Sequence, residues 1–394
     1  MASNRMVRKL NERTKDVNKV SKAETKSERS LALASVREAF GDYKAILGEH
    51  YCIDDWQAVD IVAASAVAHY IPGEPLWVRV IGGSRSGKTE ILSSYTGHAD
   101  VEKMEVFTPA SIRGGLKGAT LVVARINGKL VITKDIAALS TAPRDKRTEV
   151  LGLLRGLKDG ELTADYGSEA GRVEIKGKFD WLIGATPAVE RQRAIEGQLG
   201  ERFIDLRWRG GPRIEAALKA QGNARQMPEI RVEVSKAAHG LLDSAKKAAP
   251  ILDSDPDDKW IATLADRIAV ARTPVARDSY TKNIAYEPMP EAPTSLAQDF
   301  SRVAKGLVLL GIENYRPYLE RLGQDCLPSI RAKVLGALFA SEDGCTTAEV
   351  AERLSLPSAT AQYALEDLLA LGVVARTRGG VWKPMWESFG PKPN

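Results

Sequence analysis

The sequence predicts an α/β protein with a three-layer core, in which a mainly parallel sheet lies between two layers of helices. Two observations lead to this class. Short apolar runs with strand character alternate with helical segments, which is the pattern of parallel strands joined by helices. The first of these runs, residues 76–81, leads directly into a glycine-rich loop at residues 82–89.

The chain has 394 residues. This exceeds one typical domain of about 100–200 residues, so several domains are expected. Breaks in the pattern give five segments: a basic tail (1–30), an N-terminal helical segment (31–72), the α/β core (73–212), a helical lid and linker (213–325) and a small C-terminal domain (326–388).

The composition predicts a soluble protein of a reducing compartment. Hydrophobic residues make up 44% and charged residues 27% of the chain, which is ordinary for a globular protein. The most apolar run, residues 61–71, is shorter than the roughly 20 residues that span a bilayer, and the first residues lack the apolar stretch of a secretory signal. The three cysteines, Cys52, Cys326 and Cys345, are too scattered for a disulfide framework. We therefore expect a cytoplasmic location and no membrane contact.

The basic tail holds the whole formal net charge of +5, because residues 1–30 contain nine Lys or Arg and four acidic residues. It has no aromatic residue and few large apolar ones, so disorder is expected. One interpretation is a solvated tail that favours solubility. The other is an arm that tethers the protein to DNA through phosphate contacts.

The segment 31–72 is expected to be helical, with acidic residues at 54–55 favouring a helix start and the prolines of 72–75 ending the helix. Its apolar side chains recur on one helical face: Ile53, Trp56, Val59, Ala63 and Val67. In the core, strands are expected at 76–81, 129–133, 179–184 and 203–208, helices at 90–95 and 146–157, and a hairpin from 161–166 and 172–175. Residues 213–325 are expected to be largely helical, with breaks at 253–258 and 287–293.

The glycine-rich loop matches the pattern G-x-x-x-x-G-K-[ST] of a phosphate-binding P-loop. It consists of Gly82, Gly83, Ser84, Arg85, Ser86, Gly87, Lys88 and Thr89. Glycines let backbone N–H groups converge on phosphate oxygens, and the lysine adds a positive charge. The threonine hydroxyl is a Mg²⁺ ligand in such loops, and the following helix adds its positive dipole end. ATP and Mg²⁺ are therefore the expected ligands.

A P-loop needs an acid at the end of a neighbouring strand to hold Mg²⁺, and Asp135 after the strand 129–133 is the candidate. A second acid commonly follows and orients the attacking water, but Ile136 stands there. Asp135 could then serve both roles, Asp145 or Glu149 could supply the base, or hydrolysis could be weak.

The order of these features resembles the AAA+ ATPases that carry a hairpin before the sensor strand, such as minichromosome maintenance helicases and replication ATPases of phages and mobile elements. The likeness covers about residues 50–310. It implies that Thr186, in the strand ending Ala185-Thr186-Pro187, senses the γ-phosphate. It also implies that Arg202, in Leu199-Gly200-Glu201-Arg202-Phe203, is an arginine finger that reaches a neighbouring subunit's nucleotide.

Each of these roles has a plainer alternative. Thr186 could be a strand-end hydroxyl bonded to backbone, and Arg202 could form a surface ion pair with Glu201 or another acid. The family often has a sensor arginine at the start of the lid helix near Pro293. Here the nearest arginine is Arg302, two turns later, which puts that sensor in doubt.

Residues 326–388 resemble a winged helix, with three predicted helices (330–339, 346–354 and 358–371) and two strands (373–377 and 381–383). In that fold the third helix enters the major groove and the wing grips phosphate. The candidate base-facing residues are Ser358, Thr360 and Gln362, and the candidate wing contacts are Arg376 and Arg378. Such domains also dock proteins, and Glu366-Asp367 on the third helix suits that alternative.

The resemblance implies an oligomeric ring, expected to be a hexamer, with ATP between subunits and a function in phage or mobile-element DNA replication. DNA and replication proteins are the expected partners, and Lys176 and Lys178 at the base of the hairpin would touch DNA inside the ring. The alternative is a non-motor ATP switch, such as a helicase loader or a transcription regulator. Ile136 favours the switch, and the hairpin favours the motor.

Overall fold

The structure is a computed structural model that describes residues 27–105, 122–136, 143–165, 172–192, 202–253 and 256–391. Its centre is a five-stranded parallel sheet in the order β2–β3–β6–β1–β7. The strands are β1 Trp77–Ile81, β2 Val101–Lys103, β3 Leu130–Thr133, β6 Asp180–Ala185 and β7 Ile204–Arg207. Because all strands run the same way, their last residues meet at one edge of the sheet, here called the carboxyl edge, and their first residues meet at the amino edge.

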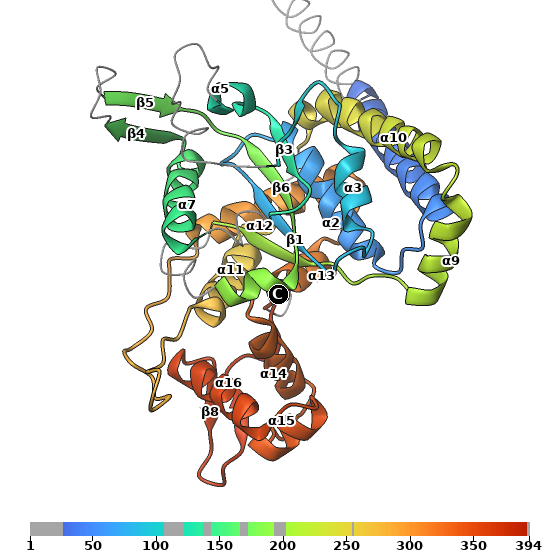
Figure 1. The fold of residues 1–394 in the computed structure, drawn as a ribbon. Helices are drawn as coiled ribbons and strands as arrows, with labels where there is room; N and C mark the ends of the chain where they lie inside the picture. The colour runs from blue at the N-terminus through green and yellow to red at the C-terminus, as the bar shows by residue number, and fades with distance from the viewer. Residues whose placement is uncertain are drawn as a thin grey trace, which may run out of the picture.

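Two layers of helices cover the sheet, as the sequence predicts (Figure 1). On one face lie α2 Trp56–Val67, α3 Lys88–Ser94 and α10 Met227–Ala248, whose apolar side chains share a cluster with Val78 and Val80. On the other face α5 Val122–Ile126 and α7 Arg144–Lys158 pack on Trp77 and Trp181. The strand side chains are buried on both faces, which explains the nearly continuous apolar runs.

The strands and helices that were predicted in the core fall within a few residues of their predicted ranges, whereas helix α5 was not predicted. Strand β2 was not predicted, because three residues with one buried side chain leave no recognisable pattern. Helix α3 begins at Lys88 rather than at Glu90. The predicted hairpin is present as β4 Glu161–Asp165 and β5 Arg172–Lys176, which pair with each other and project from the body (Figure 1). Its turn, 166–171, lies outside the described residues.

The N-terminal helical segment consists of a helix over 27–50 and then α2, which continues into η1 Ala68–Tyr70. Asp55 caps α2, since its side chain accepts a hydrogen bond from the backbone N–H of Ala58. Most of the expected disordered tail, residues 1–26, lies outside the described residues, but 27–30 are helical and correct the predicted boundary. A tertiary contact holds these residues, since Arg29 donates to both the side chain and the carbonyl of Asp253.

The largely helical segment contains α9 Arg213–Asn223, α10, η3 Ala249–Ile251, α11 Asp258–Arg272, α12 Thr294–Leu309 and α13 Arg316–Asp325. The second predicted break is longer than expected, because the chain stays non-helical from Thr273 to Pro293. Within it the backbone pairs with itself, as at the bridge between Arg277 and Ile284. Among the described residues, no helix has the length and apolar character needed to cross a bilayer.

The C-terminal residues form three helices and a small hairpin: α14 Ser329–Phe339, α15 Thr347–Arg353, α16 Ser358–Ala370, β8 Val374–Arg376 and β9 Trp382–Pro384. Thr346 and Glu349 form the predicted capping box at the start of α15. The elements therefore match the sequence prediction in type and order. In the view of Figure 1 these elements lie below the sheet, and in the chain they come directly after α13.

Candidate functional site

The glycine-rich loop joins β1 to α3 at the carboxyl edge, in the middle of the sheet between β6 and β7. Its first residue continues the sheet, since the N–H of Gly82 donates to the carbonyl of Ala185 (3.0 Å). Two later residues have left-handed backbone, Arg85 at φ 59° and Gly87 at φ 89°. Turning the backbone in this way makes successive N–H groups point into one concavity at a helix start, which is an anion-binding arrangement.

Trp208, the residue that follows β7, packs against the loop and donates a hydrogen bond to it. Its indole N–H donates to the carbonyl of Ser86 (2.8 Å). In a trans peptide the C=O and the next N–H point in opposite directions. The bond that turns the Ser86 carbonyl toward Trp208 therefore turns the N–H of Gly87 away from it. Ring and loop are also in close contact, because a Cβ placed on Gly82 would lie 3.0 Å from the Cβ of Trp208.

Lys88 lies inside the site rather than in solvent, with 4% of its surface exposed. Its ammonium donates to the carbonyl of Gly83 (3.0 Å), so the side chain reaches back across the loop. Burial lowers the pKa of Lys88 below its ordinary value, while the charge of Asp135 acts in the opposite direction. The charge of Asp135 therefore reaches Lys88 across the end of the sheet.

Asp135 reaches the site because β3 and β6 approach closely at their ends. The carbonyl of Lys134 lies where a Cβ of residue 184 would be, at 2.1 Å, so only glycine fits there. The N–H of Ile136 then donates to the carbonyl of Gly184 (2.9 Å). Asp135 itself is exposed. Ile136 packs with Ile81, Ala185 and Val189, so the position of the missing second acid is apolar and in contact with the core.

Thr186 directly follows β6, the strand between β3 and β1. In the strand order it therefore stands between Asp135 and the loop. It is half-buried, and its carbonyl accepts from the N–H of Val189 (3.2 Å) at the start of η2 Pro187–Gln192. The carboxyl edge thus brings together Lys88, Asp135 and Thr186, while Thr89 is exposed on the first turn of α3. Asp145 and Glu149, the other candidate bases, are exposed on α7.

Arg202 lies at the amino edge, two residues before β7. A strand of this length spans roughly 13 Å, so Arg202 and the loop of the same chain are at opposite edges. Its guanidinium is 3.5 Å from the carboxylate of Asp159, and its carbonyl accepts from Lys158 (2.7 Å). The ion pair expected as the plainer alternative is therefore present, with Asp159 as the partner; Glu201 lies outside the described residues.

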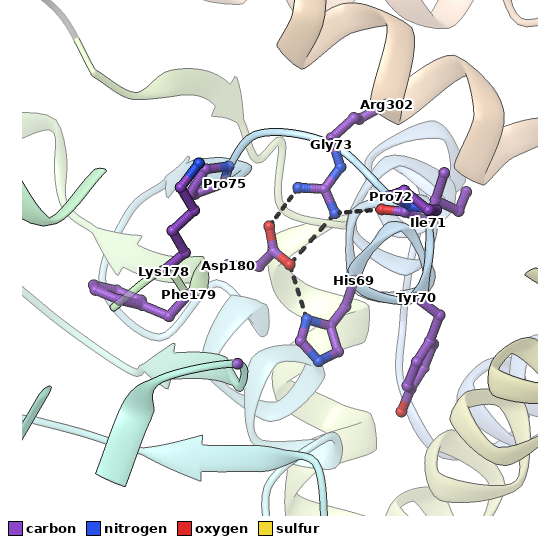
Figure 2. A pocket seen from close by; sticks show the side chains of 11 residues that line it. His69, Tyr70, Ile71, Pro72, Gly73, Pro75, Lys178, Phe179, Asp180 and Arg302 are labelled. Carbon is purple, nitrogen blue, oxygen red and sulfur yellow. Dashed lines mark hydrogen bonds and ion pairs between the residues drawn. The ribbon is translucent and has the colours of Figure 1, made fainter. Parts of the chain in front are cut away.

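Arg302 is also at the amino edge, and it is not near the loop. In a pocket of about 350 Å³ its guanidinium pairs with Asp180, the first residue of β6 (2.6 Å), and donates to the carbonyl of Ile71 (Figure 2). It also donates to the carbonyl of Glu74. His69 bonds the same carboxylate at 2.8 Å. Burial alone would raise the pKa of Asp180, but His69 and Arg302 outweigh it and lower the pKa. Arg302 ties α12 to the sheet, and a sensor role toward the loop of its own chain is excluded in this arrangement.

The lysines at the base of the hairpin differ in their surroundings. Lys176 ends β5 and is exposed. Lys178 is half-exposed and pairs with Glu74 (2.7 Å). Both lie near the end of the hairpin at which β4 and β5 join the rest of the molecule.

In the C-terminal part, Ser358 and Arg378 are exposed, and Thr360 is half-buried. Gln362 is engaged within the fold, since its amide bonds Thr347 and Glu366 (2.9 and 2.8 Å). Arg376 stacks on Trp382, with 4.9 Å between the guanidinium and the ring centre.

The two acids on α16 are paired by arginines from other elements. Arg277 contacts Glu366 (3.2 Å) and Asp367 (2.7 Å), and Arg331 contacts Asp367 (3.0 Å). The negative charges of Glu366 and Asp367, which are unfavourable on a helix that faces DNA phosphate, are therefore balanced by arginines of the same chain.

Several residues that build the loop's surroundings could not be found from the sequence. Asp55 accepts from the N–H of Arg209 (3.0 Å) and pairs with Arg321 through both of its oxygens. These contacts join α2, the segment after β7 and α13. Each of the three residues looks like an ordinary surface charge in the sequence, and only the fold brings them together.

Comparisons with known proteins give little beyond this geometry. No protein-family model matches the chain, and no curated protein matches it. Among solved structures, the chain is similar to one described as "SCCmec type IV Cch - active helicase", with 12% sequence identity and a TM-score of 0.40. The match covers 76% of this chain and 54% of that one, so the chain spans about half the length of that protein. At this level of similarity the function has to be argued from the site itself.

Proposed function

We propose that the protein binds ATP with Mg²⁺ at the loop 82–89 and hydrolyses it. One observation carries the proposal: a G-x-x-x-x-G-K-T loop stands between the interior strand β1 and helix α3, with buried Lys88 under the influence of the charge of Asp135, which follows β3. Three features at this place each attract a polyphosphate: convergent N–H groups, the start of a helix and a lysine.

The donor set also suits a magnesium ion. Mg²⁺ prefers oxygen ligands and is held by one or two carboxylate or hydroxyl groups together with phosphate and water. Thr89 and Asp135 supply one hydroxyl and one carboxylate beside the loop, and both side chains are exposed. Bound there, the ion would neutralise charge on the phosphates during transfer. Lys88 would hold the phosphate chain, and Thr186 would donate a hydrogen bond toward its end.

We further propose that the protein is an AAA+ ATPase that works on DNA as an oligomeric ring. The chain order supports this, because the hairpin β4–β5 directly precedes β6 and Arg202 directly precedes β7. Arg202 lies at the edge opposite its own loop, so an arginine finger at this position would serve a neighbour's nucleotide. The hairpin, the exposed Arg378 and the basic tail would contact DNA, with replication of a phage or mobile element as the process.

A second function, a non-motor ATP switch such as a helicase loader or transcription regulator, is favoured by a specific observation. Ile136 fills the position of a second acid and is packed against the core. A protein without a water-orienting acid would bind ATP and hydrolyse it slowly, which suits control of assembly.

The first test is the change Lys88→Ala. We expect ATP binding to weaken by roughly ten- to a hundredfold, since a charged hydrogen-bond donor is lost from a buried site. Binding would be measured by calorimetry on a variant that melts like the wild type. Lys236→Ala, which removes an exposed lysine of α10, is the matched control. Unchanged affinity in the Lys88 variant would contradict the proposed site.

The same preparations separate the motor from the switch. ATP hydrolysis would be followed without DNA, with single-stranded DNA and with duplex DNA, and the mass of the assembly would be measured by native mass spectrometry in ATP. A DNA-translocating ring should show DNA-stimulated hydrolysis and a ring mass. ATP binding with slow hydrolysis that DNA does not change would favour the switch.

A further inference from the structure

The carboxyl edge holds one more acid, Glu190, which lies on η2 four residues after Thr186. Its carboxylate forms an ion pair with the guanidinium of Arg207, the last residue of β7. Both side chains are 22% exposed, so the pair is close to the surface but not free in solvent. Neither residue belongs to a recognised sequence motif.

The sheet order fixes where this pair lies. Strand β1 stands between β6 and β7, and Ile81 is opposite Ala185 on one side and opposite Arg207 on the other. Neighbouring strands are about 4.8 Å apart. Glu190 starts from the β6 side and reaches Arg207 on β7, so the pair bridges the end of β1. Ile81 is the last residue of that strand, and the phosphate-binding loop begins with the next one.

The neighbours of Glu190 keep it at this position. Val189 packs on Ile81 and Ala185 in the same small cluster that contacts Ile136. Arg207 is itself fixed, because its N–H donates to Asp325 (2.9 Å) and its guanidinium donates to the carbonyl of Leu327 (2.7 Å). The acid is therefore held from both sides at the end of β1, the strand that leads into the loop.

We infer that Glu190 is the carboxylate that orients and deprotonates the attacking water, the role that Ile136 cannot fill. The inference rests on the proposed ATPase function and deepens it. As the water oxygen forms its bond to the γ-phosphorus, Glu190 accepts the proton. The bond from the γ-phosphorus to the bridging oxygen breaks, and its electron pair leaves with ADP. The proton then passes from Glu190 to solvent.

The pair with Arg207 gives this acid a resting position. The phosphate chain of ATP is also an anion, and at the end of β1 it competes with Glu190 for the same guanidinium. Nucleotide binding would thus release Glu190 for the water.

The deciding variant is Glu190→Gln, which keeps the size of the side chain and removes the proton acceptor. Loss of a general base slows a reaction by about 10²- to 10⁴-fold. We expect single-turnover hydrolysis to fall in that range while the dissociation constant for ATP stays within about threefold, since no phosphate contact is removed. Glu190→Asp, which keeps a carboxylate, should retain more activity than Glu190→Gln.

Three controls separate a catalytic acid from a structural ion pair. Arg207→Gln breaks the pair but leaves the carboxylate, so hydrolysis should fall by less than about tenfold. Glu149→Gln and Asp145→Asn remove the exposed acids of α7 and should leave hydrolysis unchanged. Hydrolysis at the wild-type rate in Glu190→Gln would overturn the inference. An equal loss of hydrolysis in Arg207→Gln would also overturn it, and so would a loss of hydrolysis in Glu149→Gln or Asp145→Asn. Absence of ATP binding by the wild-type protein would be a different result, since it removes the proposed function as well.

Discussion

Asp325 shows how a single buried charge near the site makes the protein sensitive to pH. It is the last residue of α13, is 4% exposed, and accepts from the N–H of Arg207 at 2.9 Å. Burial raises the pKa of Asp325 from 3.8 to about 6, and the bond from Arg207 together with the charge of Arg321 only partly offsets this. The folded protein therefore holds this proton more tightly than the unfolded chain does.

The sign of the resulting pH dependence follows from linkage. The stabilisation from the raised pKa is fully present below pH 3.8 and is lost as the pH rises through about 6. At about 1.4 kcal/mol per pKa unit, the change has an upper limit of roughly 3 kcal/mol. Asp325→Asn cannot titrate, so the wild type should lose stability relative to this variant between pH 4.5 and pH 7. Denaturant unfolding of both proteins across that range checks this, and taking the difference cancels the other titrating groups. A difference independent of pH would contradict the assignment.

At the scale of elements, the glycine-rich loop 82–89 is supported by the chain that follows β7. Trp208 bonds the carbonyl of Ser86, its own N–H donates to Ile81 (2.7 Å), and the next residue, Arg209, is held by Asp55. Asp55 in turn pairs with Arg321 on α13, which leads into the C-terminal helices. The loop is therefore connected by direct contacts to the segment that carries the C-terminal domain.

The change Trp208→Phe tests this support. Phenylalanine keeps an aromatic ring against Gly82 but loses the N–H that turns the peptide between Ser86 and Gly87. A neutral hydrogen bond contributes about 0.5–1.5 kcal/mol, so ATP affinity should fall by roughly two- to tenfold. Calorimetric titration with ATP measures the effect. Trp386→Phe is the matched control, since Trp386 stacks with Arg267 in another part of the molecule. If both variants bind ATP equally well, Trp208 does not position the loop.

The elements also show what could be predicted from the sequence. Four strands, β1, β3, β6 and β7, were predictable because strands that are buried on both faces have continuous apolar sequences. The loop was predictable because its glycines and lysine lie within eight consecutive residues. Arg302 was not, because its partner Asp180 is 122 residues away in the chain and only the fold puts both at the amino edge. The ion pair between Glu190 and Arg207 could not be predicted for the same reason, since it depends on β1 lying between β6 and β7.

For the whole molecule, the decisive feature is that the loop and Arg202 are at opposite edges of one sheet. If Arg202 acts on ATP at all, it must act on the nucleotide of another subunit, which requires a head-to-tail contact between copies of the chain. The pair with Asp159 at 3.5 Å does not prevent this, because both side chains are partly exposed and a surface ion pair contributes only about 0–1 kcal/mol. A phosphate group is a stronger partner for the fork of an arginine.

Subunit mixing tests this arrangement. Arg202→Ala alone should bind ATP but hydrolyse it poorly, and Lys88→Ala alone should bind it poorly. When the two variants are mixed in equal amounts, about one quarter of the head-to-tail contacts would combine an intact Lys88 with an intact Arg202. Hydrolysis should then recover to a corresponding fraction of the wild-type rate, while each variant mixed with itself stays inactive. Native mass spectrometry would verify that mixed assemblies form. If they form without any recovery, Arg202 is a partner of Asp159 within its own chain, and the site between subunits must be completed by a different residue.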